Sequence, residues 1–261
     1  MTERIALAIF GAGGRMGRAL VRLAHEGNQF RIVRAIDGSS TGDAGIAAGV
    51  GAIGVDFTRS PSDLGGAAAV IDFSAPGALP DIAHAATEAG AAFVSGTTGL
   101  DSEGLLSLDA ASASVPTLWE PNMSVGVHVL GELLRAAIQK LGDEFDVEII
   151  EAHHKRKLDA PSGTAKRLAE IAKDARRGGT FVHGREGKAA ARTKDEIAVL
   201  AVRGGDVIGD HHVHLLAEGE RIELVHRATT RDLFARGALR AAAWLVGKPA
   251  GRYRLADVLR T

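Results

Sequence analysis

Hydrophobic and polar positions in the first part of the chain alternate between short apolar runs and helix-length amphipathic segments. Ile5 to Phe10 is a continuous apolar run of strand length, which is typical of a strand buried on both faces of a parallel sheet. A helical pattern follows over residues 16–23, and Ile32 to Ile36 forms a second apolar run. This alternation predicts an α/β fold.

The same alternation continues to about residue 123. Further strands are expected at Ala69 to Phe73, Ala92 to Ser95 and Thr117 to Trp119, and helices at Leu79 to Ala89 and around Glu103 to Leu108. Residues 38–52 are rich in Gly, Ser and Ala, which predicts a loop. These segments extend the α/β pattern of the N-terminal unit.

The pattern changes near residue 124. Ser124 to Lys140 has helical spacing, Val147 to Ile150 has strand character, and a further helical pattern begins at Gly163. Three strand-like segments then follow, at Ile197 to Val202, Asp210 to Leu216 and Arg221 to Ala228. Short turns between consecutive strands indicate a more antiparallel sheet than in the first half, and a last helix is expected over Arg231 to Val246.

Composition and charge limit the classes of function. The 261 residues are 46% hydrophobic and 24% charged, and a formal net charge of -1 gives no global field for nucleic acid or an anionic membrane. The chain has no cysteine, which excludes disulfides, thiolate chemistry and cysteine-based zinc sites. The apolar run before Gly11 is too short for a signal sequence or a membrane span, so we expect a cytoplasmic protein.

A glycine-rich turn joins the first strand to the first helix, and it reads Gly11-Ala12-Gly13-Gly14-Arg15-Met16-Gly17. The second strand ends in Asp37, 20 residues after Gly17. Strand, glycine turn, helix, strand and terminal acid together predict a dinucleotide-binding unit, in which the glycines let the backbone approach the pyrophosphate and the acid binds ribose hydroxyls. Met16 takes the place of the third glycine of the standard fingerprint, so the spacing Gly11, Gly14, Gly17 fits better. The alternative is a glycine-rich turn of an α/β protein that binds no nucleotide.

The ligand crevice of such a sheet lies at the carboxyl ends of its strands. On that basis Phe73, Gly96 to Thr98 and Glu120 to Met123 are expected to lie together near the nicotinamide. Each of these segments could instead be only a tight connection between two elements.

The stretch from Glu151 to Ala165 combines positive charge with a helix start. Five basic or potentially basic side chains come in a row, namely His153, His154, Lys155, Arg156 and Lys157. Pro161 and Ser162 follow, and the helical pattern begins at Gly163. The free N–H groups and positive dipole end of a helix suit a carboxylate or phosphate, so the stretch predicts a clamp for a small polyanion. The alternative is a solvated charge run before an ordinary N-cap.

Three histidines, His211, His212 and His214, raise the question of a metal site. In a strand, His212 and His214 share one face while His211 points the other way. No nearby carboxylate completes a ligand set, so no metal site is predicted.

The motifs occur together in one known family. The string His-His-x-x-Lys-x-Asp-Ala-Pro-Ser-Gly-Thr-Ala, which begins at His153, is highly specific. The other matching pieces, in the family's order, are Gly11 to Gly17, Gly96 to Gly99, Pro121 to Ser124, Ala201 to Gly205, Gly209 to His211 and His226 to Arg231. Over nearly its whole length the chain resembles the 4-hydroxy-tetrahydrodipicolinate reductase (dihydrodipicolinate reductase) family of the diaminopimelate route to lysine.

The resemblance implies an α/β fold in which a Rossmann-like dinucleotide-binding domain carries an inserted α+β substrate and tetramerisation domain. The expected boundaries are 1–123 plus 231–261 for the first domain and 124–230 for the second. A homotetramer assembled through the sheets of the second domain is also implied. The implied activity is NAD(P)H-dependent reduction of the cyclic imine derived from 4-hydroxy-tetrahydrodipicolinate, a small dicarboxylate, to tetrahydrodipicolinate.

The resemblance also implies roles for individual residues. His153 and Lys157 are expected as the catalytic proton donors, and the expected substrate contacts are His154, Gly163 and Thr164. The expected cofactor contacts are Gly11, Ala12, Gly13, Gly14, Arg15, Met16, Asp37, Gly96, Thr97, Thr98, Glu120, Pro121, Asn122 and Met123. Glu120 stands where a small residue is usual, and Gly38 stands where some members have an arginine.

The residues fit this chemistry independently of the resemblance. Reduction of a conjugated cyclic imine requires a held nicotinamide, an acid near the carbon that collects the proton, and cations for two carboxylates. Asp37 would repel a 2′-phosphate and Gly38 has no side chain to offset that repulsion, so NADH is expected to be preferred to NADPH. Dual use through Ser39, Ser40 or Thr41 is the alternative. Two other functions stay open, a related dehydrogenase of another amino-acid precursor and a catalytically silent nucleotide sensor.

Overall fold

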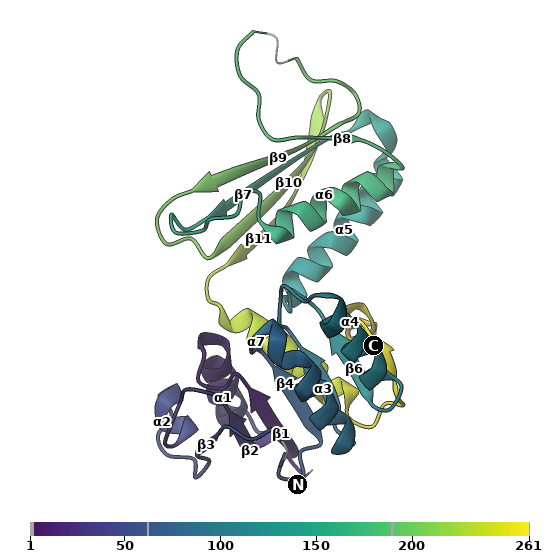
Figure 1. Cartoon of the computed structure of the whole chain (residues 1–261). Coiled ribbons are helices and arrows are strands. Elements are labelled where there is room, and N and C mark those ends of the chain that lie inside the picture. The colour runs from purple at the N-terminus through teal and green to yellow at the C-terminus, as the bar shows by residue number, and fades with distance from the viewer. Residues whose placement is uncertain (1–2, 62, 189–190, 261) are drawn as a thin grey trace. The chain divides into compact units, whose positions relative to one another are not determined.

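The computed structural model describes residues 3–61, 63–188 and 191–260 (Figure 1). The chain divides into two compact units: unit 1 is Met1–Ser124 with Asp232–Thr261, and unit 2 is Val125–Arg231. The expected domains also contain residues 1, 2, 62, 189, 190 and 261, which lie outside the described residues. None of the described helices is long and apolar enough to cross a membrane.

Unit 1 is built on a seven-stranded parallel sheet. Its strands are β1 Ile5–Phe10, β2 Phe30–Ile36, β3 Phe57–Thr58, β4 Ala69–Asp72, β5 Ala92–Ser95, β6 Pro116–Trp119 and β12 Gly251–Tyr253. They lie in the order β12-β6-β5-β4-β1-β2-β3. The chain first builds outward from β1 to β3 and later returns to build outward from β4, so the direction of winding switches between β1 and β4. Such a switch point is where open α/β sheets bind their ligands.

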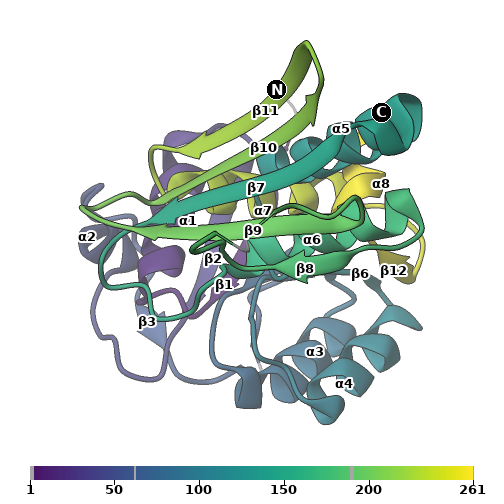
Figure 2. The ribbon, with the colours of Figure 1, turned by 90° about the horizontal axis from the view of Figure 1, so that it is seen from above.

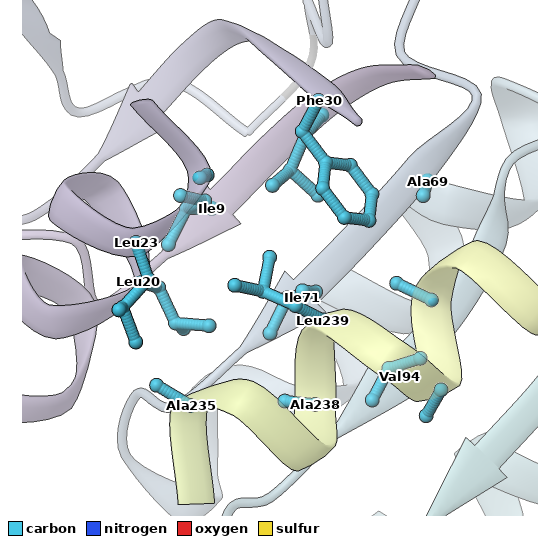
Figure 3. Close-up of a cluster of buried hydrophobic side chains, with 14 of the residues drawn as sticks. Ile9, Leu20, Leu23, Phe30, Ala69, Ile71, Val94, Ala235, Ala238 and Leu239 are labelled. Carbon is cyan, nitrogen blue, oxygen red and sulfur yellow. The ribbon is translucent and has the colours of Figure 1, made fainter. Parts of the chain in front are cut away.

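Helices cover both faces of this sheet, which is why its strands are continuous apolar runs. The helices are α1 Arg15–Glu26, α2 Ala44–Ala48, α3 Leu79–Glu88, α4 Ser102–Ser112, α7 Asp232–Leu245 and α8 Leu255–Leu259, with a 3₁₀ turn at Pro76–Ala78. Figure 3 shows Leu20 of α1 and Ala238 of α7 packed with Ile9 and Ile71 of the sheet. Helices α3 and α4 cover the opposite face, where Phe93 is fully buried.

The segment 38–52 contains a short helix, whereas its composition predicts only a loop. The Asp43 carboxylate produces this helix, because its Oδ1 accepts hydrogen bonds from the N–H groups of Gly45 (2.8 Å) and Ile46 (3.1 Å) at the start of α2. Two further N–H groups of the returning chain bind the same carboxylate. A capping side chain, which hydrophobic spacing does not reveal, therefore organises this segment.

Unit 2 contains a five-stranded mixed sheet, β7 Asp146–His153, β8 Thr180–Val182, β9 Glu196–Arg203, β10 Gly209–Ala217 and β11 Glu220–Ala228, in the order β11-β10-β7-β9-β8. Helices α5 Val125–Leu141 and α6 Gly163–Arg176 lie on one face, and a 3₁₀ turn spans Gly142–Glu144 (Figure 2). Leu134 and Leu168 pack there against Ile149 and Val213. The two sheets confirm the predicted α/β fold, with a Rossmann-like unit and a second α+β unit.

Strand β7 runs further than its apolar pattern predicts. The pattern predicts Val147 to Ile150, but the strand continues to His153, and buried positions alternate along its whole length. Glu151 and His153 therefore project toward the same, helix-covered side of the sheet. This alternation buries two ionisable side chains next to each other at the carboxyl end of β7.

Candidate active site

The turn from β1 into α1 leaves no room for side chains. Gly11 has a φ of 69°, and a Cβ at this position would collide with the backbone carbonyl of Phe73. A Cβ at Gly17 would collide with the carbonyl oxygen of Gly11, and one at Gly13 would collide with the side chain of Ser40. The glycines thus let three segments approach closely beside the helix start. We call this turn, Gly11 to Gly17, the glycine cradle, and it fits the pyrophosphate of a dinucleotide.

The start of α1 faces the same cradle. Gly14 is the N-cap and offers no side chain, so the first N–H groups of the helix receive no capping hydrogen bond from it. Arg15 is exposed at the first helical position, Met16 is half-buried against the core, and Ala12 is buried. A helix start of this kind suits an anion.

Asp37 closes the cradle at the end of β2. One carboxylate oxygen accepts hydrogen bonds from the Ser39 N–H and hydroxyl (both 3.0 Å) and the Ser40 N–H (2.9 Å), and the other accepts from the Gly13 N–H (3.1 Å). Burial alone would raise the pKa of Asp37, but the hydrogen bonds from Ser39 and Ser40 outweigh it and lower the pKa to about 2. Beside it, a Cβ at Gly38 would meet open space.

The carboxyl ends of four strands line up at one edge of the sheet. The strand register pairs Phe10 with Asp72, Asp72 with Ser95, and Ser95 with Trp119. The residue that follows each of these is therefore at the same edge, which brings the segments expected near the nicotinamide together. Phe73, one of these following residues, packs its ring where a side chain at position 96 would otherwise be.

Hydrogen bonds with Asp72 and Trp119 hold the Gly96 to Thr98 segment in place. Thr97 is buried, its hydroxyl donates to Asp72 (2.8 Å), and its carbonyl oxygen accepts from the indole N–H of Trp119 (2.8 Å). Gly96 is buried, whereas Thr98 is exposed. The backbone of this segment, with the side chain of Thr98, is thus the part that can meet a cofactor.

The residues after β6 are placed differently from one another. The Glu120 carboxylate accepts a hydrogen bond from the Leu255 N–H (3.4 Å) at the start of α8. Pro121 is exposed, and the Asn122 side chain accepts a hydrogen bond from the backbone two residues on (2.9 Å). Met123 is buried in the core, which leaves only its backbone for contact with a ligand.

In unit 2, a buried carboxylate holds His153. The Glu151 side chain is fully buried, and its Oε2 lies 2.6 Å from the His153 Nδ1. Arg203 binds both oxygens of the same carboxylate (2.7 and 2.8 Å), and the Ser162 N–H donates to it (2.9 Å). Burial raises the pKa of Glu151, but the hydrogen bonds from Arg203, His153 and Ser162 outweigh burial and lower it. Glu151 is therefore an anion that orients the imidazole.

The other side of His153 faces a glycine and two more imidazoles. A Cβ at Gly209 would lie 3.0 Å from the His153 Nε2, so the glycine leaves space at this atom. The His211 ring lies edge-on to His153, with 5.3 Å between ring centroids, and His226 follows at 6.3 Å from His211. Burial, and then the charges of His153 and His226, lower the pKa of His211 from its ordinary value to about 4.

His211 lies on the opposite face of β10 from His212 and His214, as strand alternation predicts. Within the part of the chain that the structure describes, no group of three His, Cys, Asp or Glu side chains could hold a metal ion.

The basic stretch leads from β7 to α6. The Lys157 ammonium pairs with the Asp159 carboxylate (2.8 Å). Burial, and then the charges of Arg156 and Arg231, lower the pKa of His154. The His154 Nε2 also lies 3.5 Å from the Arg231 guanidinium, which favours a neutral imidazole in an environment that remains positive.

Helix α6 starts directly after this stretch. Ser162 is the N-cap, and its hydroxyl accepts a hydrogen bond from the Ala165 N–H (3.2 Å). Gly163 and Thr164 form the first turn, where Gly163 is exposed and Thr164 is half-buried. The predicted proton donors and the predicted carboxylate-binding helix start thus belong to one connected piece of unit 2.

Two sequence models of one family match the chain. The N-terminal model of dihydrodipicolinate reductase matches residues 5–123, and the C-terminal model matches residues 126–259. A 4-hydroxy-tetrahydrodipicolinate reductase of Anaeromyxobacter sp. (strain Fw109-5) is 45% identical, over 98% of this chain and 97% of its own. The chain belongs to the dihydrodipicolinate reductase family. A reductase of the same name from Acinetobacter baumannii (strain ATCC 17978) is 42% identical over 99% of this chain and 97% of its own.

Membership of the dihydrodipicolinate reductase family confirms the predicted resemblance and activity. The chain is an NAD(P)H-dependent oxidoreductase that reduces the cyclic imine derived from 4-hydroxy-tetrahydrodipicolinate, in the diaminopimelate route to lysine. Because the cofactor is a nicotinamide dinucleotide, the glycine cradle of unit 1 has a ligand that it fits.

Solved structures agree with the fold. The chain is similar to a dipicolinate-bound dihydrodipicolinate reductase from Paenisporosarcina sp. TG-14, with a TM-score of 0.76 and 22% identity over 97% of this chain and 98% of that one. A gentamicin A biosynthesis protein in complex with NAD has a TM-score of 0.61 and 12% identity, over 99% of this chain and 91% of that one. At these identities the likeness concerns the fold.

Sequence reasoning gives no role to three further residues of this candidate site. Glu151 is the first residue of the stretch Glu151 to Ala165, and its spacing of two from His153 was the signal that both share one face of a strand. Arg203 and His211 lie far from His153 in the sequence and are brought to it by the neighbouring strands β9 and β10. Both lie in segments that match the family, but no local pattern indicates that they lie beside His153.

Proposed function

We propose that unit 1 binds the nicotinamide cofactor through its glycine cradle, and that unit 2 binds the imine through its two carboxylates and protonates it. Of all the observations, the buried Glu151–His153 pair beside the start of α6 supports this most. It provides an oriented acid and an anion site in one short stretch. NADH supplies the hydride in this reaction.

His153 is the first proposed proton donor. Its Nδ1 is occupied by Glu151, so the proton to be donated is on Nε2, at the atom for which Gly209 leaves space. The Glu151 carboxylate holds the imidazole in one orientation, in the same way that a carboxylate orients a catalytic histidine in other enzymes.

Lys157 is the second proposed proton donor, and the start of α6 beside it is the proposed clamp for the carboxylates. The Lys157 ammonium is held by Asp159, and a substrate carboxylate can replace that partner or join it. The N–H groups of Gly163 and Thr164, the Thr164 hydroxyl and the His154 ring are the proposed contacts of the second carboxylate. Dipicolinate, which is bound to the reductase of Paenisporosarcina sp. TG-14, is a planar dicarboxylate of this kind.

We also propose that NADH is the preferred coenzyme. Ser39 and Ser40 both bind the Asp37 carboxylate, so neither can serve a 2′-phosphate without leaving it. Arg34, the neighbouring cation on β2, pairs instead with Asp63. The repulsion between Asp37 and a 2′-phosphate therefore stays uncompensated, and the preference should amount to about 1–2 kcal/mol.

A homotetramer through the sheet of unit 2 belongs to the same proposal, together with the cytoplasmic location expected from the sequence. Helices α5 and α6 lie on one face of this sheet only (Figure 2). Apolar side chains such as Val202 (51% exposed) and Val225 (41% exposed) lie on the other face. Uncovered apolar side chains on a sheet face favour association with another copy.

One assay tests the proposal: coenzyme oxidation with enzymatically generated substrate, measured as kcat and KM for both NADH and NADPH. Replacing His153 or Lys157 by Gln should lower kcat by about 10²-fold or more with coenzyme binding unchanged. Gly38→Arg should reduce or reverse the NADH preference, because a guanidinium can pair with the phosphate. Pyridine-2,6-dicarboxylate should compete with the substrate.

Each part of the proposal can be contradicted by a separate result. Near-native kcat in both the His153 and Lys157 variants would show that another residue donates the proton. A clear NADPH preference of the unmodified protein would contradict the role given to Asp37 and Gly38. A dicarboxylate that does not compete at millimolar concentration would contradict the clamp at α6.

A further inference from the structure

Asp72 is a fully buried carboxylate that no cation pairs with in the part of the chain that the structure describes. It is the last residue of β4 and 0% exposed, and among the described residues no lysine, arginine or histidine forms an ion pair with it. Buried carboxylates are normally paired with a cation, because an isolated charge is costly to remove from water. A residue of this kind requires an explanation that packing does not supply.

The groups around Asp72 are all hydrogen-bond donors. Its Oδ1 accepts from the N–H (2.9 Å) and hydroxyl (2.6 Å) of Ser74, and its Oδ2 accepts from the hydroxyls of Ser95 and Thr97 (both 2.8 Å). The Ser95 oxygen also accepts from the Thr97 N–H (3.2 Å), so its own hydrogen is free to point at Asp72. The Ser74 N–H can only donate and the three hydroxyls can each donate one hydrogen, so this environment fits the ionised form, which only accepts hydrogen bonds.

The position of Asp72 relates it to the cofactor rather than to the core. It pairs with Phe10 of β1 and Ser95 of β5, directly beside the point where the direction of winding switches. The Asp37 end of the cradle lies on the β2 side of that switch point and takes the adenosine ribose, and the pyrophosphate takes the start of α1. The nicotinamide half then extends to the β4 and β5 side, over the loops that Asp72 holds.

We propose that Asp72 is a positioning residue that also sets the redox balance of the bound cofactor. Its hydrogen bonds fix the loops that follow β4 and β5, and its uncompensated negative charge stabilises the positively charged oxidised nicotinamide relative to the neutral reduced one. Loss of hydride creates a cation on the ring, so a buried anion nearby favours hydride donation. This inference rests on the cofactor site proposed above.

The charge of Asp72 can act on the nicotinamide because no cation among the described residues neutralises it. Hydroxyl and N–H dipoles stabilise the carboxylate, but they leave its net charge of one unit in place. In a low-dielectric environment such a charge acts over several ångströms and is only weakly screened by salt. A guanidinium at the same position would cancel it.

The test compares the affinities of NAD⁺ and NADH for the whole chain without substrate, by calorimetry or ligand fluorescence. Asp72→Asn should raise the Kd of NAD⁺ by about tenfold more than the Kd of NADH. For a two-electron couple, this corresponds to about 30 mV in the potential of the bound cofactor. Ser95→Ala removes one donor but keeps the charge, so it should change both affinities by the same factor.

A second variant covers the case in which Asp72→Asn fails to fold. Ser74→Lys places an ammonium beside the intact carboxylate, and it should shift the ratio of the two Kd values in the same direction, whereas Ser74→Met, of similar length, should not. A ratio that changes in neither Asp72→Asn nor Ser74→Lys, with both coenzymes still bound, would overturn the role of Asp72 alone. Failure of the unmodified protein to bind either coenzyme would overturn the proposed cofactor site itself.

Discussion

Two fully buried carboxylates, Glu151 in unit 2 and Asp72 in unit 1, stand at the ends of strands and are stabilised in opposite ways. Glu151 is bound on both oxygens by the Arg203 guanidinium and also contacts His153. Asp72 is bound by three hydroxyls and one N–H group, and no cation pairs with it among the described residues. Both satisfy the requirement that buried polar groups be hydrogen-bonded.

The difference between their partners indicates a different role for each carboxylate. A carboxylate that is paired with arginine keeps little net field, so Glu151 acts mainly through geometry, by orienting the His153 imidazole. A carboxylate that is hydrogen-bonded only to neutral groups keeps its net charge. Asp72 therefore acts through its electric field on the nicotinamide that we propose binds near it. The partners of a buried acid, rather than its burial, therefore distinguish an orienting role from an electrostatic one.

The largest effect is expected when the orienting carboxylate is removed. Glu151→Gln leaves the half-buried Arg203 guanidinium without its carboxylate partner, which should cost about 3 kcal/mol of unfolding free energy, and it frees the His153 ring, which should lower kcat by about 10²-fold or more. Urea unfolding and the reductase assay measure the two effects. Glu148→Gln is the matched control, because Glu148 lies on the same strand and is also paired with arginines, but it points to the opposite face. Equal loss of kcat in both variants would argue against orientation.

The second effect concerns the pH dependence of stability. The folded pKa of His211, about 4, lies below the ordinary value of 6.5, so between these values the unfolded state binds more protons. Stability should therefore fall as pH decreases from about 6.5 toward 4, by about 2 kcal/mol at pH 4.5 from this group. His211→Gln should remove that part of the slope in urea unfolding across this range. An unchanged slope would show that His211 is already protonated, or equally neutral in both states.

The smallest effect is expected when one of the dipoles around Asp72 is removed. Thr97→Val keeps the shape of the side chain but deletes one of the four hydrogen bonds, which should cost about 1 kcal/mol of unfolding free energy. Thermal or urea unfolding measures this loss. A cost as large as that of Glu151→Gln would mean that Asp72, like Glu151, depends on a single dominant partner.

Local pattern in the sequence was sufficient for much of unit 1. The apolar runs of β1, β2 and β5, the glycine turn and the acid after β2 are consecutive features, so strand periodicity and turn chemistry identify them without knowledge of neighbours. The short helix α2 was missed because a capping aspartate, and not hydrophobic spacing, produces it. The predicted family and α/β fold are confirmed, whereas the predicted roles of individual site residues stay predictions.

What the sequence by itself determined was the identity of most of the longer elements and the motif that carries His153, Lys157 and the start of α6. The tertiary structure alone decided which distant groups complete them. Arg203 of β9 contacts Glu151 of β7. Ser95 of β5 and Thr97, which follows β5, contact Asp72 of β4. The physical reason is that spacing along the chain specifies which face a side chain occupies, whereas its partner depends on the register between strands that fold together from separate segments.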